Sequence, residues 1–154
     1  MTGPLEATNR PYAMAKLAGL EMCWAYNRQY GTRFVCAMPT NLYGPGDNYD
    51  LQTSHVLPAL VRKFHEARVR GDKTVTLWGT GSPRREFLYS DDMAEACVQL
   101  LVGADDKLTT LLPADQAPLV NIGCGEDVAI RELAELVREV VGCSAAIVWD
   151  HDKP

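Results

Sequence analysis

The sequence predicts an α/β fold in which helices alternate with short strands of a partly parallel sheet. Two stretches, residues 11–30 and 130–141, repeat apolar residues at helical spacing, and each is followed by a glycine, Gly31 or Gly142, which commonly ends a helix. Because strands that alternate with helices usually pair in parallel, we expect a parallel sheet. Short apolar runs with the length of buried strands occur at residues 33–38, 119–123 and 145–149.

The remaining elements follow from local signals. Residues 1–10 are rich in loop-forming residues, and Pro11 suits the first turn of the helix that follows. Residues 39–48 contain glycines and prolines typical of a turn. Thr53 and Ser54 are good helix caps, which places His55 near the start of the next helix.

The second half of the chain continues the alternation. Residues 74–78 alternate apolar and polar side chains as a strand does, and residues 85–89 are expected to be extended. Residues 90–92, Ser-Asp-Asp, supply a cap and an acidic first turn for a helix over residues 93–101. Residues 103–118 are polar without clear periodicity and are expected to form a surface loop.

Composition narrows the class of protein. The 154 residues are 47% hydrophobic and 23% charged, as in a soluble globular domain. The formal charge of −5, without a dense basic block, argues against nucleic acid as a partner. No apolar run approaches the roughly 20 residues that cross a bilayer, so we expect no membrane contact and a cytoplasmic protein. The five cysteines contain no CxxC pair, and no metal site is expected among them and the three histidines.

Tyr12 and Lys16 are candidate catalytic residues. Four residues apart on a helix, their side chains lie about one turn apart on the same face. An ammonium held beside a phenol favours the ionised phenolate, which suits a tyrosine to proton transfer. The same spacing also occurs on ordinary solvated helices. Leu17, Leu20, Cys23 and Trp24 form the apolar stripe of an amphipathic helix, which predicts that this helix packs against the rest of the fold.

Thr40 and Asn41 follow the first predicted strand. In open α/β sheets, ligands bind at the carboxyl ends of parallel strands, so both are candidate site residues. A turn-capping role is equally consistent with their position.

Four motifs in order resemble the second half of extended short-chain dehydrogenase/reductases that act on nucleotide sugars. Three further stretches, residues 27–31, 38–48 and 54–60, look very like the members that convert GDP-4-keto-6-deoxy-mannose to GDP-L-fucose. The motifs are Tyr12-x-x-x-Lys16, Pro39-Thr40-Asn41-Leu42-Tyr43-Gly44-Pro45, the run from Arg85 to Ala94, and Asn121-Ile122-Gly123-x-Gly125.

The resemblance implies an enzyme that epimerises C3 and C5 of the sugar and reduces the C4 ketone with NADPH. Tyr12 would donate a proton to the C4 oxygen, and Lys16 would hold the nicotinamide ribose hydroxyls. His55 matches the family's acid/base for epimerisation. The cofactor would contact Tyr12, Lys16, Pro39, Thr40, Asn41, Leu42 and His55.

The resemblance also implies a GDP-sugar site. Lys63 and Arg85 fall where cations hold the diphosphate, and Trp78 falls where an aromatic ring packs on the base or ribose. Asn41 would lie near the sugar. Some relatives carry arginine at the position of Lys63, and lysine keeps that charge without the bidentate fork.

The sequence contains no strand followed by a G-x-x-G-x-x-G turn, which binds the dinucleotide in this family. The chain therefore resembles a carboxyl-terminal portion of such an enzyme. We expect this portion to be inactive by itself. The family's catalytic serine and epimerisation cysteine match no position here. The resemblance implies a Rossmann-domain remnant over residues 1–45, and a substrate domain over residues 46–154 that contains one returning Rossmann strand near 119–123. The full-length protein is expected to be a homodimer.

Two alternatives remain. One is another nucleotide-sugar epimerase or dehydratase, which would share Tyr12 and Lys16 but not the Ser-His-Val context of His55. The other is a non-catalytic interaction module, since a truncated parallel sheet exposes an apolar edge that favours association.

Overall fold

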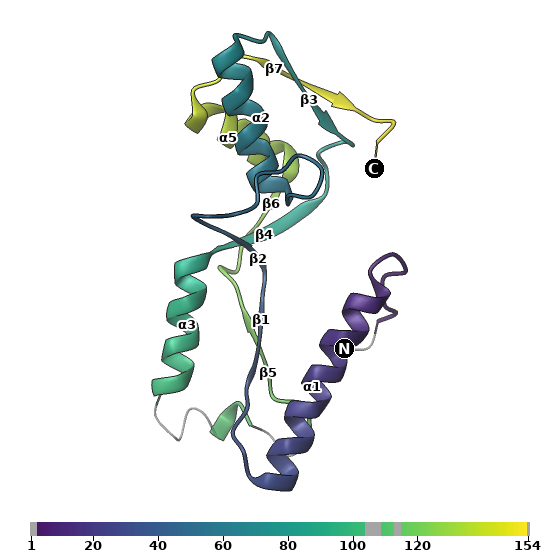
Figure 1. Cartoon of the computed structure of the whole chain (residues 1–154), viewed down its shortest axis with the longest axis vertical. Coiled ribbons are helices and arrows are strands. Elements are labelled where there is room, and N and C mark those ends of the chain that lie inside the picture. The colour runs from purple at the N-terminus through teal and green to yellow at the C-terminus, as the bar shows by residue number, and fades with distance from the viewer. Residues whose placement is uncertain (1–2, 104–108, 113–114, 154) are drawn as a thin grey trace. The chain divides into compact units, whose positions relative to one another are not determined.

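The computed structural model describes residues 3–103, 109–112 and 115–153 and has the predicted α/β architecture. Figure 1 labels the elements. Their bounds are α1 Arg10–Tyr30, β1 Cys36–Pro39, β2 Asn41–Tyr43, α2 Val56–Arg70, β3 Thr74–Trp78, β4 Arg84–Tyr89, α3 Ser90–Val102, β5 Leu119–Ile122, β6 Asp127–Ala129, α5 Ile130–Val141 and β7 Ala146–Asp150. None of the described helices has the length and apolar character needed to span a membrane.

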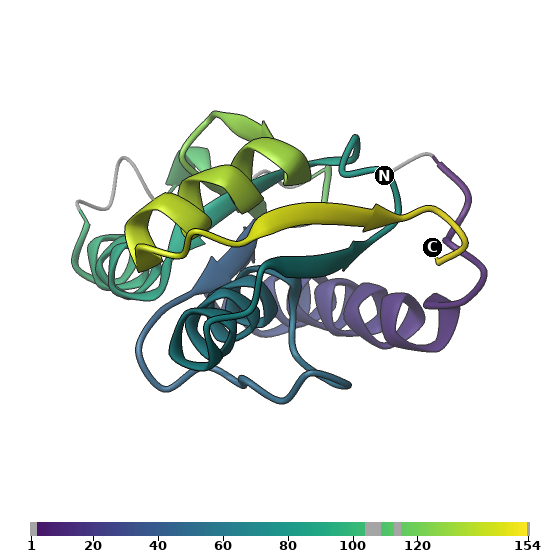
Figure 2. The ribbon, with the colours of Figure 1, turned by 90° about the horizontal axis from the view of Figure 1, so that it is seen from above.

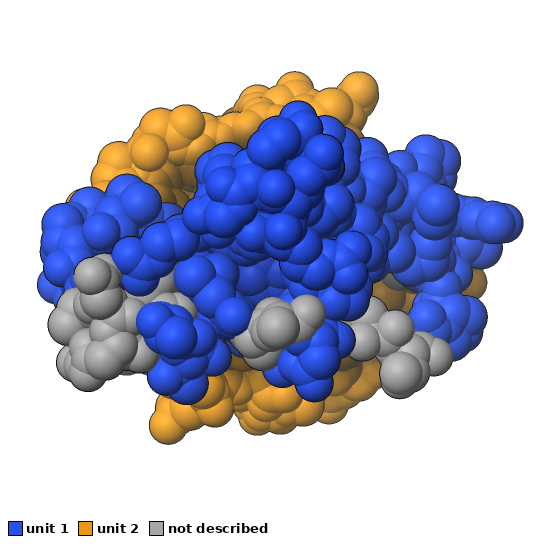
Figure 3. Space-filling model, turned by 90° about the horizontal axis from the view of Figure 1, so that it is seen from below, with its two compact units in different colours: residues 1–39, 94–122 blue, residues 40–93, 123–154 orange. Residues whose placement is uncertain are grey.

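The chain divides into two compact units, coloured separately in Figure 3. Unit 1 comprises Met1–Pro39 and Ala94–Ile122, and unit 2 comprises Thr40–Met93 and Gly123–Pro154. Unit 1 therefore contains α1, β1 and β5, and unit 2 contains α2, α5 and the other five strands. The predicted domain boundary after residue 45 stays a prediction.

Parallel pairing joins segments that are far apart in the sequence. The parallel pairs are β1 with β5, β2 with β4, and β3 with β7, whereas β4 and β6 pair antiparallel. The β3–β7 ladder is in register from Thr74 opposite Ala146 to Trp78 opposite Asp150. Figure 2 shows these two strands side by side and pointing the same way.

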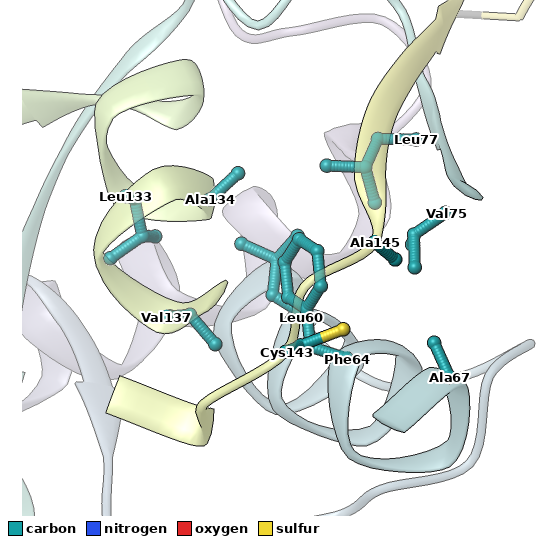
Figure 4. Close-up of a cluster of buried hydrophobic side chains, with 10 residues drawn as sticks. All are labelled: Leu60, Phe64, Ala67, Val75, Leu77, Leu133, Ala134, Val137, Cys143 and Ala145. Carbon is teal, nitrogen blue, oxygen red and sulfur yellow. The ribbon is translucent and has the colours of Figure 1, made fainter. Parts of the chain in front are cut away.

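The hydrophobic core of unit 2 lies between two helices and the β3–β7 pair. Helix α2 contributes Leu60, Phe64 and Ala67, whose three- and four-residue spacing puts them on one face. Figure 4 shows these side chains together with those of the other elements. The other members of the cluster are Val75, Leu77, Leu133, Ala134, Val137, Cys143 and Ala145.

In unit 1, the inward face of α1 is the predicted stripe: Leu20 is buried, and Leu17, Cys23 and Trp24 are half-buried. The prediction of a strand over residues 33–38 was wrong at its start. The side-chain oxygen of Asn27 accepts hydrogen bonds from the Thr32 hydroxyl and the Phe34 amide, which holds residues 32–34 against the last turn of α1. Residues 31–35 are consequently outside any strand, and β1 begins at Cys36.

Two strands were not predicted, and one predicted feature needs correction. Residues 41–43 and 127–129 form β2 and β6. The expected caps Thr53 and Ser54 do not cap α2, because His55 occupies the N-cap position and Thr53 bonds instead to Asp50.

The two strands expected to be buried, β1 and β5, are at most half-buried, since each has one strand neighbour in the described chain. The predicted loop over residues 103–118 lies in large part outside the described residues.

The core position of Phe64 predicts a large loss of stability on truncation. Phe64 is fully buried, so Phe64→Ala should lower the free energy of unfolding by about 3–5 kcal/mol in a urea titration. Val69→Ala on the same helix is the control, because Val69 is 69% exposed and its loss should cost no more than about 0.5 kcal/mol. Equal effects of the two substitutions would contradict the described core.

Candidate active site

Helix α1 presents Tyr12 and Lys16 on an exposed face. Pro11 lies in the first turn, and Gly31 ends the helix with φ 66°, donating its amide to the Asn27 carbonyl at 3.1 Å. As the spacing predicts, the Lys16 ammonium lies over the Tyr12 ring, with Nζ 5.3 Å from the ring centroid. The Tyr12 side chain is 60% exposed, so a ligand can reach both groups.

The strand-end residues lie where β1 passes into β2. Pro39 ends β1, and the side-chain amide of Asn41 in β2 donates to the Glu86 carbonyl at 2.8 Å. The Thr40 hydroxyl oxygen is buried and has no hydrogen-bond partner among the described residues. Leu42 is exposed and lines a small open pocket of about 200 Å³ together with residues of the 43–47 turn.

Glu86, which the sequence analysis missed, fixes the backbone at this edge. Its Oε1 accepts the Gly125 amide at 2.7 Å, while its carbonyl holds Asn41. A Cβ at Gly123 would collide with that carboxylate and approach the Thr40 methyl to 2.8 Å, so only glycine fits. The clue in the sequence was the Gly123-x-Gly125 motif, in which Gly123 permits this close approach and Gly125 adopts a φ of 84°.

His55 occupies the N-cap position of α2. Its backbone is extended, its carbonyl accepts the Ala59 amide at 3.1 Å, and its side chain makes no capping hydrogen bond. The residue is exposed, which leaves the imidazole accessible to a substrate.

Lys63 and Trp78, 15 positions apart in the sequence, meet in unit 2. The Lys63 ammonium lies 5.4 Å from the Trp78 ring centroid and donates to the Thr76 carbonyl at 3.2 Å. Burial lowers the pKa of Lys63 from its usual value, so part of its hydration is already lost and an arriving anion would interact with it more strongly. Trp78 is 57% exposed, and its open face can stack on a flat ligand.

Arg85 extends from β4 and is exposed, with its guanidinium donating to the Arg84 carbonyl at 2.9 Å. The neighbouring Arg84 has a different environment: it bonds Asp127 at 2.8 Å and lies 3.8 Å from Glu132. The ion pairs of Arg84 therefore tie β4 to β6 and α5, and Arg85 retains donors for a ligand.

The structure thus joins the predicted residues into local groups. In unit 1 it brings together Tyr12 and Lys16, and in unit 2 it brings together Lys63 and Trp78. Asn41 and Thr40 share the strand edge braced by Glu86. Among the described residues, no cluster of three His, Cys, Asp or Glu side chains could hold a metal.

A pocket of about 310 Å³ in unit 2 was not predicted. Its wall on α2 is formed by Leu57, Pro58 and Val61. Tyr43 and Tyr89, whose ring centroids lie 5.5 Å apart, also line it. On the helical wheel, this face of α2 lies away from Lys63, so the pocket is separate from the Lys63–Trp78 pair.

A Tyr-x-x-x-Lys pair on a helix, together with parallel strands that alternate with helices, is typical of Rossmann-type α/β oxidoreductases and epimerases. The family model for the NAD dependent epimerase/dehydratase family matches residues 1–111. The chain belongs to this family.

Individual relatives agree with this assignment. GDP-L-fucose synthase 1 of Arabidopsis thaliana is 54% identical over 154 residues, which is the whole of this chain and 45% of the relative. GDP-L-fucose synthase of Escherichia coli K12 is 47% identical over 156 residues, with 100% of this chain and 48% of the relative covered. The chain spans about half the length of the curated relatives it matches.

Solved structures share the fold. MlghC, a GDP-mannoheptose C4 reductase from Campylobacter jejuni with NADP bound, superposes with a TM-score of 0.84 at 36% identity. The match covers 97% of this chain and 52% of that structure.

The packing at Gly123 leads to a prediction. In Gly123→Ala, the added methyl must displace the Glu86 carboxylate, so we expect a stability loss of about 1–3 kcal/mol and faster hydrogen exchange at the Gly125 amide. Gly19→Ala is the control, because a Cβ at Gly19 meets nothing within 4 Å and alanine favours a helix. An undiminished protection of the Gly125 amide in Gly123→Ala would contradict the described bracing.

Proposed function

We propose that the complete protein is a GDP-L-fucose synthase, and that this chain provides its Tyr-Lys helix and its sugar-nucleotide-binding unit. The proposed reaction is 3,5-epimerisation of GDP-4-keto-6-deoxy-D-mannose followed by NADPH-dependent reduction at C4. Identity of 54% along the entire chain to a relative of that name supports it. The observation that carries the chemistry is the Lys16 ammonium held over the exposed Tyr12 ring.

The residues present fit an NADP cofactor. Lys16 offers three N–H donors beside Tyr12 on an exposed helix face, which suits two ribose hydroxyls. The backbone from Pro39 to Leu42 passes through a strand end where the Thr40 hydroxyl has an unused hydrogen-bonding capacity. Reduced nicotinamide, when bound, supplies the hydride for C4. His55 is the remaining proposed contact to the cofactor.

Tyr12 is proposed to protonate the C4 oxygen. As hydride reaches C4, negative charge develops on that oxygen, and a phenol in hydrogen-bond reach can transfer its proton there. Lys16 then stabilises the phenolate that remains, because its ammonium is fixed near the ring.

His55 is proposed to move protons during epimerisation. A proton next to a ketone is acidic, because the enolate formed on its removal is stabilised by the carbonyl. Imidazole exchanges protons near neutral pH, which suits it to take or return a proton at C3 or C5. The exposed position of His55 at the start of α2 leaves its ring accessible for this task.

The GDP moiety is proposed to bind to Lys63, Trp78 and Arg85, with Asn41 near the sugar. Lys63 and Arg85 provide cations for the diphosphate, and the open face of Trp78 stacks on the base or ribose.

A homodimer and a cytoplasmic location complete the proposal. Support for an interface comes from apolar side chains exposed on α1, including Met14 at 51%, Met22 at 59% and Tyr26 at 46%.

Tyr12 can be tested in a chimera in which this chain replaces the matching segment of the Arabidopsis relative. We expect the chimera to form GDP-L-fucose with NADPH, and Tyr12→Phe to lower kcat by about 10²–10⁴-fold with little change in KM. Tyr26→Phe, on the same helix, is the control and should retain activity. Full activity in Tyr12→Phe would contradict the role of Tyr12 as the proton donor.

His55→Gln in the same chimera separates the two reactions. We expect loss of solvent deuterium incorporation at C3 and C5, measured by mass spectrometry of the sugar in D₂O, because the proton-exchanging group is gone. His65→Gln, also exposed on α2, is the control. Undiminished deuterium incorporation in His55→Gln would contradict the proposed role.

Nucleotide preference distinguishes the proposal from a UDP-sugar epimerase. GDP should raise the melting temperature of the chain more than UDP, because a purine covers more of the exposed Trp78 ring. Lys63→Gln should weaken GDP binding by about tenfold or more through loss of a charged contact, whereas Lys73→Gln should not. A larger shift with UDP would favour the alternative epimerase, and no shift with either nucleotide would favour a non-catalytic module.

A further inference from the structure

Asp50 organises the short loop that leads into His55. Its side-chain Oδ1 accepts three hydrogen bonds of 3.0 Å, from the amides of Gln52 and Thr53 and from the Thr53 hydroxyl. Its backbone carbonyl accepts the Ser54 amide at 2.8 Å. One residue therefore holds the three positions that directly precede His55.

Asn48 adds to this network. Its side-chain oxygen accepts the Asp50 amide at 3.0 Å, and its side-chain amide donates to the Thr53 hydroxyl at 2.9 Å. These two bonds hold Asp50 itself against Thr53, so the loop is fixed from both sides.

The loop is also attached to the helix that follows it. Arg62 in α2 donates from Nη1 to the Tyr49 carbonyl at 2.8 Å, while its Nε bonds Glu66 at 2.7 Å. Residues 49–62 therefore form a ring that is closed by a hydrogen bond, and His55 lies within it. Closing the ring restricts the backbone conformations that are open to His55.

The position of the His55 imidazole depends on this backbone. The residue is exposed, and its side chain makes no capping hydrogen bond. Its backbone has φ −69° and ψ 167°, the extended conformation of an N-cap residue. Since no capping bond holds the side chain, the backbone of residue 55 decides which volume the ring can reach.

The charge state of Asp50 suits it to hold the loop. Hydrogen bonds from the Gln52 amide and from the hydroxyl and amide of Thr53 hold the pKa of Asp50 below its usual value. The carboxylate is therefore ionised at neutral pH. Its bonds to N–H and O–H donors are then stronger than bonds to a neutral oxygen would be.

We propose that Asp50 is a positioning residue for His55: its carboxylate holds residues 52–54 in one conformation and so sets where the imidazole stands relative to a bound sugar. Asp50 acts through the backbone and takes no part in proton transfer itself. The positioning of residue 55 concerns this chain alone, whereas its consequence for epimerisation rests on the proposed function of His55. A misplacement of about 1 Å can cost about 100-fold in rate, so a loosened loop should slow epimerisation.

Nitrogen-15 relaxation of the backbone amides tests the positioning on this chain. In the wild type, the order parameters of Thr53, Ser54 and His55 should be about 0.85, and in Asp50→Ala they should fall below about 0.6. Asp50→Asn should stay near the wild-type values, because all three bonds use Oδ1, an oxygen that asparagine also has. Asp50 is exposed, so neither substitution disturbs the core.

Asp72→Ala is the matched control. Asp72 follows the other end of α2 and pairs with Arg70 at 2.9 Å, so its substitution removes the same charge without touching the loop. The order parameters of residues 53–55 should stay unchanged. Wild-type order parameters in Asp50→Ala would overturn the proposal, as would an equal loss in Asp72→Ala.

The consequence for catalysis is measured in the Arabidopsis chimera as solvent deuterium incorporation at C3 and C5. In Asp50→Ala we expect kcat for incorporation to fall by about 10–100-fold, with KM for the GDP-sugar changed by less than about twofold. Asp50→Asn should recover most of the rate, which shows that the hydrogen bonds matter more than the charge.

His55→Gln separates the two claims. An undiminished rate in Asp50→Ala, in a chimera whose rate falls in His55→Gln, would overturn the proposal. An undiminished rate in His55→Gln would instead refute the proposed role of His55 in epimerisation, and the order parameters would still decide whether Asp50 fixes residue 55.

Discussion

The fixed approach of an ammonium to a phenol is the interaction on which the account of this protein depends. Lys16 reaches the Tyr12 ring because the two residues lie one turn apart at the start of a 21-residue helix. Capping at Gly31 ends that helix, and burial of Leu20 packs it against unit 1, while Tyr12 and Lys16 near its start stay exposed. A tyrosine that must lose and regain a proton needs such a cation, since water alone stabilises its anion poorly at neutral pH.

The other functional groups depend on a second constraint, the close packing of backbone at the strand ends. Glu86 serves two segments at once, with its carbonyl bound to Asn41 and its carboxylate to the Gly125 amide. Gly123 makes room for this arrangement. On the core side of the same unit, α2 holds Lys63 against Trp78 through the packing of its buried face on β3 and α5. Rigid neighbours therefore position each polar group before a ligand arrives, which reduces the entropy lost on binding.

Sequence reasoning succeeded where the signal is local. Gly31 and Gly142 end their helices in the left-handed conformation, as a glycine after a periodic stretch predicts. Strand β3 has the predicted bounds because its alternation of exposed and buried residues is regular. The parallel pairing of β3 with β7, by contrast, joins residues about 70 positions apart, and no local pattern specifies such a partner.

The features that were not predicted also have physical causes, because a local sequence pattern does not determine them. Strands β2 and β6 have three residues each, too few to show a period, and β2 is fully exposed in the described chain. The late start of β1 follows from one side chain, Asn27, that captures the backbone of Phe34 before the strand begins. The role of Glu86 could not be predicted, because a charged residue in a strand usually indicates a solvent-exposed position.

A structure of the complete protein with NADP and GDP bound is the most direct measurement of the central claim. The account predicts that the Tyr12 hydroxyl and the Lys16 ammonium both face the nicotinamide ribose, in the same cavity as His55 and Asn41. Finding Tyr12 and Lys16 turned apart, or separated from that cavity by other side chains, would contradict it.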